Sequence, residues 1–271
     1  MMTALTPPGS RLQRVNPLVK LLAIVPPVTL AMLSNDPYLP SALALLAVLT
    51  LWIGGVSLRQ LVRAVLPAAA LIIFFLVSYP LVIRRELVLD TPVIFSLGGL
   101  EVRWGALQAG AKAGLRIFAL VTLTLVFSLT TDGAAFVRAL VQQARLPYRV
   151  GFAFIAAFRF LPLIQQEVSV IRAAHRARGV DDGPGPLGLF RRARRMAVPL
   201  LASAIRQAER AALAMDGRAF GAFPQRTWLH RAHFTYADPL FLAAFWLSVA
   251  AILWGLWRLG LLAPLVIVQR L

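Results

Sequence analysis

The sequence has no cysteine and only two lysines, Lys20 and Lys112, although it carries 28 basic residues in all. The absence of cysteine excludes disulfides, thiol catalysis and cysteine-based metal sites, so nothing in the chain needs an oxidising compartment. Neither lysine belongs to a G-x-x-x-x-G-K-[ST] phosphate-binding loop, so the chain has no P-loop of its own. If such a protein depends on ATP, another protein must supply the energy by binding and hydrolysing it.

Acidic residues are also scarce, with 11 against 28 basic residues and a formal net charge of +17. No pair of acids lies within a long apolar run, which argues against a self-contained proton-driven or sodium-driven carrier. The basic excess predicts an anionic neighbour such as phospholipid head groups or an acidic protein face. Hydrophobic residues, in contrast, make up 59% of the chain, and its mean hydropathy of +0.75 is typical of an integral membrane protein.

Several apolar runs approach the roughly 20 residues that a helix needs to cross about 30 Å of hydrocarbon. The candidate spans are residues 17–34, 38–56, 64–83, 105–129 and 239–257. We interpret the first as a transmembrane helix rather than a signal peptide, because further spans follow it and no clear cleavage site does. The prediction is an all-α, polytopic membrane protein with about five transmembrane helices. Its divisions are residues 1–129 with four spans, a polar segment 130–236, and a C-terminal membrane segment 237–271.

The distribution of basic residues orients these spans. Positive charges precede the first span and separate the second from the third, at Arg11, Arg14, Lys20, Arg59 and Arg63. Both sites are therefore expected in the cytoplasm, and so is the segment 130–236, which holds sixteen arginines. On the outer side, residues 91–105 combine two β-prone runs around Gly98-Gly99, which predicts a short hairpin.

A short amphipathic helix is predicted directly after the fourth span. Thr131 or Asp132 supplies its N-terminal cap, and Pro147 ends the segment. Between these residues an apolar stripe opposes a polar face, a pattern that suits the membrane interface.

Two longer helices are predicted to follow. The first runs from about Leu163 to Arg178, where Gly179 suits a left-handed C-terminal cap. The second starts near Arg194 or Pro199. Its small-residue face, which lets helices approach closely, reads Ala204, Ala208, Ala211, Met215 and Arg218. We expect the two helices to cross and to project Arg178 and Arg218 from their ends.

A repeated phrase marks the ends of these two helices. "RAAHRARGV" (172–180) can be laid over "ALAMDGRAF" (212–220), and Arg178 then falls on Arg218. A single arginine in the last turn of a helix is explained by the helix macrodipole or by membrane topology alone. Neither explanation requires the same context twice, so this pair of arginines is the candidate functional site.

Few other residues carry distinctive chemistry. His175, His230 and His233 are the only histidines, and without nearby carboxylates or thiols they are not expected to hold a metal. Arg116 lies in the fourth span, where it either has a function or extends its guanidinium to the membrane surface. The sequence predicts no catalytic residue, no cofactor and no metal site.

Three stretches of the chain resemble the transmembrane T components of energy-coupling factor (ECF) transporters, a group that includes the cobalt-type permease subunits. These stretches are "RLQRVNPLVKLL" (11–22), residues 129–179 and residues 198–221. The resemblance covers most of the chain, and its strongest motifs are the two arginine phrases.

The resemblance implies that residues 130–236 form a cytoplasmic coupling domain whose two long helices cross in an X. Each helix would end in an x-Arg-x motif that docks in a groove of an ATP-binding cassette subunit. The corresponding motifs here are Ala177-Arg178-Gly179 and Gly217-Arg218-Ala219. The first agrees with the common Ala-Arg-Gly pattern, whereas the second departs from it in both flanking residues, which puts the fine geometry of the second contact in question.

The same resemblance implies a non-catalytic, energy-coupling subunit of an ATP-driven importer of a vitamin or transition metal ion, in the inner membrane of a bacterial cell. Its expected partners are two ATP-binding cassette ATPases, one substrate-binding membrane protein (the S component) and membrane lipid, with no nucleic acid. The S component selects the substrate in this family, so cobalt, nickel, biotin and other vitamins all stay open.

Two alternatives come from other classes of protein. A conventional permease of an ATP-binding cassette importer has one coupling loop per subunit, and two docking motifs in one chain argue against it. A membrane-anchored basic module would bind nucleic acid or anionic lipid through many arginines at once. The aromatic residues of that region argue against nucleic acid, because they lie in an apolar run and not among exposed charges: Phe152, Phe154, Phe158 and Phe160.

Overall fold

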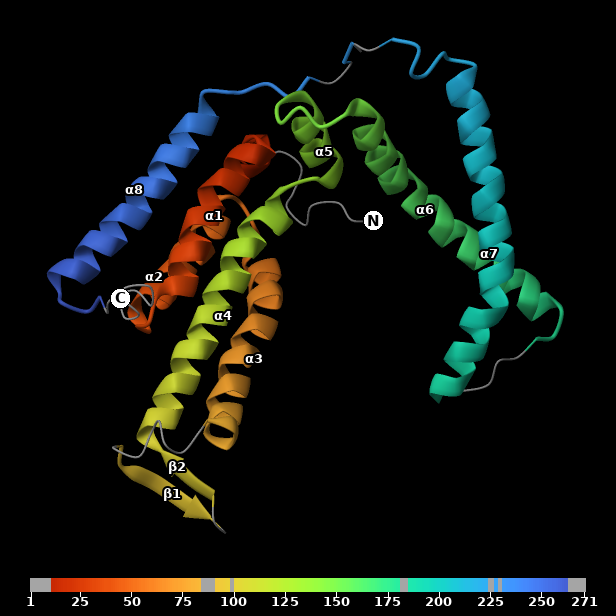
Figure 1. The fold of residues 1–271 in the computed structure, drawn as a ribbon. Helices are drawn as coiled ribbons and strands as arrows, with labels where there is room; N and C mark the ends of the chain where they lie inside the picture. The colour runs from red at the N-terminus through yellow and green to blue at the C-terminus, as the bar shows by residue number, and fades with distance from the viewer. Residues whose placement is uncertain are drawn as a thin grey trace. The chain divides into compact units, whose positions relative to one another are not determined.

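The computed structural model describes residues 11–83, 91–97, 100–180, 185–223, 227–228 and 231–262 (Figure 1). The chain divides into two compact units. We call residues 137–232 the crossed-helix unit, and residues 2–136 together with 233–271 the bundle unit.

The elements are almost all helical, which confirms the predicted all-α membrane fold. The bundle unit contains a 3-10 turn η1 (Arg11–Arg14), α1 (Pro17–Leu33), α2 (Tyr38–Ile53), α3 (Leu58–Val82), β1 (Val93–Leu97), β2 (Leu100–Arg103), α4 (Trp104–Thr130) and α8 (Ala237–Arg258). The crossed-helix unit contains the end of α5 (Gly133–Gln142), α6 (Tyr148–Ala177) and α7 (Gly185–Asp216).

The membrane spans agree with the predicted ones in three cases. Among the described residues, four helices are long and apolar enough to cross a membrane: α3, α4, α6 and α8. Of these, α3, α4 and α8 match predicted spans, while α6 falls in the segment that the sequence assigned to the cytoplasm. The predicted first two spans are the shorter apolar helices α1 and α2, of 17 and 16 residues. At about 1.5 Å per residue, each covers roughly 25 Å.

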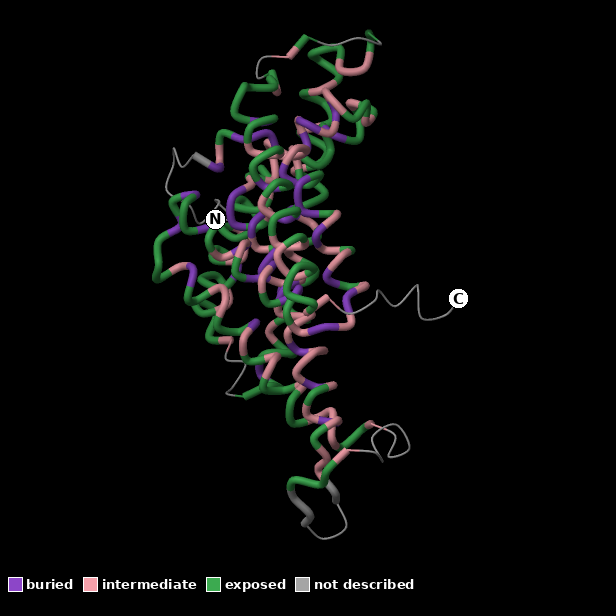
Figure 2. The backbone as a smooth tube through the Cα atoms, turned by 90° about the vertical axis from the view of Figure 1, so that its left-hand side faces the viewer, coloured by how far each residue is buried: buried purple, intermediate pink, exposed green. Residues whose placement is uncertain are grey.

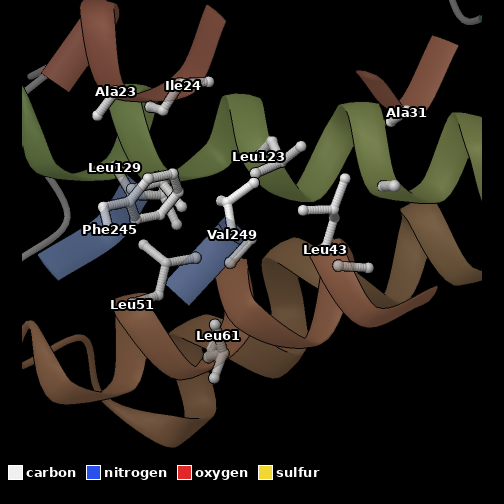
Figure 3. Close-up of a cluster of buried hydrophobic side chains, with 14 of the residues drawn as sticks. Ala23, Ile24, Ala31, Leu43, Leu51, Leu61, Leu123, Leu129, Phe245 and Val249 are labelled. Carbon is white, nitrogen blue, oxygen red and sulfur yellow. The ribbon is translucent and has the colours of Figure 1, made fainter. Parts of the chain in front are cut away.

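The helix α4 is the centre of the bundle unit, because it contacts α1, α2 and α3. Its buried residues Leu123 and Val126 belong to one apolar cluster with Leu43 of α2 and with Phe245 and Val249 of α8. Figure 3 shows Leu43, Leu123, Phe245 and Val249 meeting between the helices, and Figure 2 marks the buried positions along the backbone.

Two glycines let α4 approach α3 closely. A Cβ atom on Gly110 would lie 2.7 Å from the carbonyl oxygen of Phe75, and one on Gly114 would lie 2.9 Å from the Cα atom of Ile72. The glycines are four positions apart, so both lie on one face of α4 and form a small-xxx-small contact of the kind found between membrane helices.

A buried cluster of charges ties three helices of the bundle together. Lys20 of α1 is 1% exposed and donates from Nζ to the carbonyl oxygen of Thr130, the last residue of α4, at 2.9 Å. Asp238, in the first turn of α8, is also 1% exposed and attracts the ammonium of Lys20. Its carboxylate accepts the backbone N–H groups of Asn16 and Thr235, both at 2.7 Å. The two opposite charges can therefore be buried together.

Arg116 has a structural role in this unit. Its Nη2 donates to the backbone carbonyl of Ser34, which follows α1. The carbonyls at the end of a helix lack partners within the helix, and a guanidinium beside the end of α1 is favoured by the helix macrodipole as well. The guanidinium is thus held inside the bundle.

Both long helices of the crossed-helix unit begin earlier than predicted. The helix predicted from Leu163 begins at Tyr148, and the one predicted from Arg194 or Pro199 begins at Gly185. Each contains an internal proline, Pro162 or Pro199, that the sequence favours as a boundary. The prediction was wrong because helices of 30 and 32 residues keep most of their hydrogen bonds despite the few that one proline removes.

Two local predictions are confirmed. Asp132 caps α5, since its Oδ2 accepts the backbone N–H of Ala135 at 2.9 Å. The predicted hairpin exists as β1 and β2, which pair antiparallel, with Leu97 opposite Leu100. Its turn, Gly98-Gly99, lies outside the described residues.

We expect Lys20→Met to lower the free energy of unfolding by about 3–5 kcal/mol, because Asp238 is left as a buried charge without its partner. Lys20→Met combined with Asp238→Asn should cost clearly less than the two single changes added together. Denaturant unfolding of the purified protein in detergent, followed by circular dichroism, measures both. Lys112→Met is the matched control and should stay within about 0.5 kcal/mol. Additive single changes would show that the two charges are not coupled.

Gly110→Ala should destabilise the bundle by about 1–3 kcal/mol, because the new methyl group collides with the backbone of α3. Gly255→Ala in α8 is the control, since a Cβ atom there meets nothing within 4 Å. That change should be neutral or stabilising by up to about 1 kcal/mol, as alanine favours helix over glycine. Thermal unfolding of the two variants side by side tests the contact, and equal effects would contradict it.

Candidate functional site

The helices α6 and α7 contact each other and cross (Figure 1). Their most buried side chains are Ile171 of α6 and Met196 and Ser203 of α7, at 8%, 8% and 6% exposure. The crossing that the sequence predicted is present, but the face of α7 was assigned wrongly, since Ala204 and Ala208 are exposed. The reason is that Met196 and Ser203, seven residues apart, set a contact line on another side of the helix.

Arg178 occupies the C-terminal cap of α6 and is exposed. The turn after it is closed by two backbone hydrogen bonds, from Gly179 N to Arg176 O at 3.0 Å and from Val180 N to His175 O at 3.1 Å. Gly179 has φ +69°, and this left-handed residue together with the two bonds makes a Schellman motif. The chain reverses at once, so Arg178 is left at the tip of the helix.

Arg218 occupies the same position in an equivalent turn at the end of α7, and it is also exposed. Ala219 N donates to Asp216 O at 2.9 Å, and Phe220 N donates to Met215 O at 3.0 Å. Ala219 has φ +51°. Each donor and acceptor of the first turn thus has a counterpart forty residues later, and the repeated phrase in the sequence encodes a repeated backbone turn.

The two turns differ at the left-handed residue. Gly179 adopts φ +69° without a steric penalty, whereas the Cβ of Ala219 makes its φ of +51° costly by about 1–2 kcal/mol. The flanking residues that depart from the family pattern therefore leave the backbone turn intact and add strain to it.

Aromatic contacts hold the end of α7 against the start of α6. The ring of Phe220 lies 4.6 Å from that of Phe152 and 5.9 Å from that of Tyr148, measured between centroids. These contacts favour a fixed position for the strained turn. A signal for Phe220 was present in the sequence, because Phe220 stands where Val180 stands in the first phrase. That position commonly carries an apolar contact after a Schellman turn.

The two arginines lie at opposite ends of the crossed pair. Arg218 lines a cavity of 420 Å³ together with Phe152 and Arg159, near the start of α6. Arg178 lies at the other end of α6, nineteen residues beyond Arg159, which corresponds to roughly 30 Å along the helix axis. The structure therefore presents the predicted site residues as two separate tips, Ala177-Arg178-Gly179 and Gly217-Arg218-Ala219.

Hydrogen bonds between side chain and backbone close the crossed-helix unit where the chain enters and leaves it. Ala232 donates its N–H to Oε1 of Gln142 at 2.7 Å, and its carbonyl accepts from Nε2 of Gln143 at 3.1 Å. Residues ninety positions apart are thus paired, which fixes the end of α5 relative to the returning chain.

The histidines form no metal site in the described part of the chain, where no group of three or more potential ligands gathers. His175 is half-buried on α6, and His233 is exposed. His230 lies outside the described residues.

Comparison with known proteins gives one matching family. The family model described as "CbiQ: Cobalt transport protein" matches residues 8–229. The energy-coupling factor transporter transmembrane protein EcfT of Bacillus subtilis is 30% identical over 240 residues, which cover 85% of this chain and 89% of that protein. EcfT of Thermosediminibacter oceani is 28% identical over 260 residues, covering 91% and 94%, and EcfT of Brevibacillus brevis is 28% identical over 262 residues, covering 93% and 96%.

The strain at Ala219 can be measured directly. Ala219→Gly should stabilise the last turn of α7 by about 0.5–1 kcal/mol, because glycine accepts the left-handed conformation. Gly179→Ala should destabilise the last turn of α6 by a similar amount, through the backbone alone, since a Cβ atom there meets nothing within 4 Å. Hydrogen exchange of peptides covering residues 172–180 and 212–220 reports each turn. Changes of the same sign in both variants would contradict the left-handed assignment.

Proposed function

The chain belongs to the CbiQ family of cobalt transport proteins and is similar over most of its length to EcfT transmembrane proteins of energy-coupling factor transporters, and on this basis we propose that it couples ATP hydrolysis by partner subunits to import. In this proposal it is a non-catalytic membrane subunit in the inner membrane of a bacterial cell. Two ATP-binding cassette ATPases bind its crossed helices, and the crossed helices move a substrate-binding membrane protein, the S component.

One observation supports this function above the others: two arginines occur on turns with equivalent hydrogen bonds, at the opposite tips of two crossed helices. Membrane topology requires positive charge, but it does not require the same Schellman turn twice. Arg218 shares a cavity lining with Arg159, which lies roughly 30 Å along α6 from Arg178, so we expect each guanidinium to need a groove of its own. Two equivalent tips therefore fit two copies, or two homologues, of one ATPase partner.

The chemistry of the tips suits docking in a polar or acidic groove. A guanidinium offers a planar fork of N–H donors that fits carboxylates and backbone carbonyls. The neighbours Ala177 and Gly179, and likewise Gly217 and Ala219, are small, so the partner can approach the backbone closely. Both arginines are exposed, so their docking needs no rearrangement of the helices.

The crossed helices can transmit the motion of the ATPases. When the two ATPases close on ATP, each moves the tip that is bound to it. The two tips then change their distance from each other, and the angle between α6 and α7 changes with it. The contact that serves as pivot is small, with Ile171, Met196 and Ser203 at its centre. Large apolar side chains elsewhere on the two helices stay exposed, among them Phe154, Leu201 and Leu213, and they offer a surface for the S component.

The transported substrate in this proposal is a vitamin or a transition metal ion, and it is selected by the S component. A metal ion would then be cargo and not a cofactor of this chain.

We expect Arg178→Glu together with Arg218→Glu to abolish co-purification with ATP-binding subunits encoded beside this gene. Each buried arginine contact contributes about 2–5 kcal/mol, so reversing both charges should weaken binding by at least about a thousandfold. Each single variant should retain one ATPase, and native mass spectrometry of the purified complex distinguishes the two stoichiometries.

Arg206→Glu together with Arg210→Glu is the matched control, because both arginines are exposed on α7 away from its tip. This control changes the net charge equally and should retain both ATPases. A double tip variant that still binds two ATPases and supports uptake would overturn the docking assignment.

A further inference from the structure

A cavity in the bundle unit lies between α2, α8 and the turn η1. Its volume is 490 Å³, within the range of about 300–1,000 Å³ that is typical of ligand sites. Its lining comes from Leu12 and Val15, from residues 46–54 of α2 and from residues 237–248 of α8. We call this cavity the α2–α8 groove.

The lining of the α2–α8 groove is apolar. It contains two hydroxyl groups, and both already donate to their own helices. Thr50 Oγ1 donates to the carbonyl oxygen of Leu46 at 2.7 Å, and Ser248 Oγ donates to that of Ala244 at 2.8 Å. All other lining residues carry hydrocarbon side chains or are glycine. The groove therefore suits hydrocarbon, because a polar occupant would lose its hydration without new hydrogen bonds in return.

The groove has a buried floor and exposed edges. Among its lining residues, Phe245 and Leu12 are 4% and 5% exposed, whereas Leu240 and Ile53 are 71% and 70% exposed. The helix α8 is long and apolar enough to cross a membrane. Exposed apolar edges on such a helix face the hydrocarbon of the bilayer, so the groove is open to lipid.

The length of the groove matches one leaflet of the bilayer. Its lining extends along α8 from Ala237 to Ser248, which corresponds to about 16 Å along the helix axis. Half of the hydrocarbon core measures about 15 Å. The groove thus begins at the first residue of α8 and ends near the middle of that helix. A partner helix that crossed the membrane would need a contact about twice as long, whereas an acyl chain ends at this depth.

Two polar side chains flank the end of the groove at which α8 begins. Asn16 donates its N–H to Oδ1 of Asp238 at 2.7 Å, which joins the start of α1 to the start of α8. Arg14 and Tyr236 each lie two residues before one partner of this bond, both are exposed, and the residue after each lines the groove. Arginine binds phosphate through charge-assisted hydrogen bonds, and tyrosine favours the boundary between membrane and water.

Exposed basic residues prevail at this end of the bundle unit. Arg59 and Arg63, in the first turns of α3, are exposed like Arg14. The carboxylate of Asp238, in contrast, is buried and attracts Lys20. Exposed basic residues beside a membrane helix attract anionic head groups, so the expected lipid is an anionic one.

We propose that the α2–α8 groove binds an anionic phospholipid, with one acyl chain between α2 and α8 and the phosphate beside Arg14. The bound lipid contacts η1, α2 and α8, three elements that are far apart in the sequence. This site does not depend on ATPase docking, because the groove belongs to the bundle unit and both arginine tips belong to the crossed-helix unit.

The experiment uses the full-length protein in neutral detergent, with a phosphatidylglycerol that carries a photoactivatable diazirine in one acyl chain as the probe. After irradiation, mass spectrometry of peptides locates the label. We expect the label on residues 46–54 and 237–248, and little on the exposed apolar residues of α3, such as Ile73 and Val77. Equal labelling of α3 would indicate general contact with lipid and overturn the proposal.

Two pairs of variants test the acyl chain. Ala244→Trp fills the groove and should weaken binding of the probe at least about tenfold, because excluding about two methylenes already corresponds to that factor. Ala243→Trp is its control, since Ala243 is exposed on α8 and does not line the groove. Leu240→Gln makes the lining polar without adding volume, and Leu247→Gln is the control at 70% exposure outside the lining. Equal losses in the variants and their controls would contradict the site.

A third pair tests the head group. Arg14→Gln should weaken phosphatidylglycerol binding by about three- to tenfold and reduce its salt dependence, whereas Arg59→Gln should change neither. The wild type should bind a diacylglycerol with the same chains more weakly than phosphatidylglycerol. If the diacylglycerol binds as tightly, or if Arg14→Gln has no effect, the groove is a general apolar surface and the phospholipid assignment is wrong.

A protein occupant is tested in the assembled complex. The label should stay on the groove when the S component and the ATPases are bound. Loss of the label on binding of the S component would assign the groove to that protein and overturn the lipid assignment. Arg178→Glu with Arg218→Glu should leave the label unchanged, so a failure of ATPase docking is distinguished from a failure of the lipid site.

Discussion

The burial of Lys20 is the interaction on which the architecture of this protein depends. An ammonium group at 1% exposure in an apolar bundle is stable only with a compensating charge and hydrogen-bond acceptors, and Asp238 and the carbonyl of Thr130 supply them. Thr130 is the last residue of α4 and Asp238 lies in the first turn of α8, so the chain leaves the bundle and returns to it at this cluster. The chain therefore leaves the bundle unit after Thr130, which accepts a hydrogen bond from Lys20, and returns to it at Asp238, which attracts the same lysine.

Within the crossed-helix unit, a small pivot and well-defined tips are combined. The crossing buries few side chains, and its centre is made by Ile171, Met196 and Ser203. The tips, in contrast, are closed by repeated backbone hydrogen bonds, and the second is held further by Phe220 against Phe152. Few side chains therefore hold the crossing of the two helices, whereas defined backbone hydrogen bonds hold each tip.

The arginines of this unit fall into groups with different surroundings. Arg178 and Arg218 are single side chains on protruding turns, whereas Arg172 and Arg176 share a cavity with two arginines of α7. A protruding arginine with small neighbours suits a groove in a partner.

Much of the protein followed from sequence alone. Hydrophobic runs located α3, α4 and α8, Asp132 identified the cap of α5, and the repeated phrase identified Arg178 and Arg218, because these signals depend on neighbours along the chain. The starts of α6 and α7 were missed, since Pro162 and Pro199 are locally unfavourable and only the full length of each helix outweighs them. The attraction between Lys20 and Asp238, the aromatic contacts of Phe220 and the four-arginine cavity were decided by the tertiary structure. Each joins residues far apart in sequence, and no local pattern records which distant side chain will neutralise, cover or repel another.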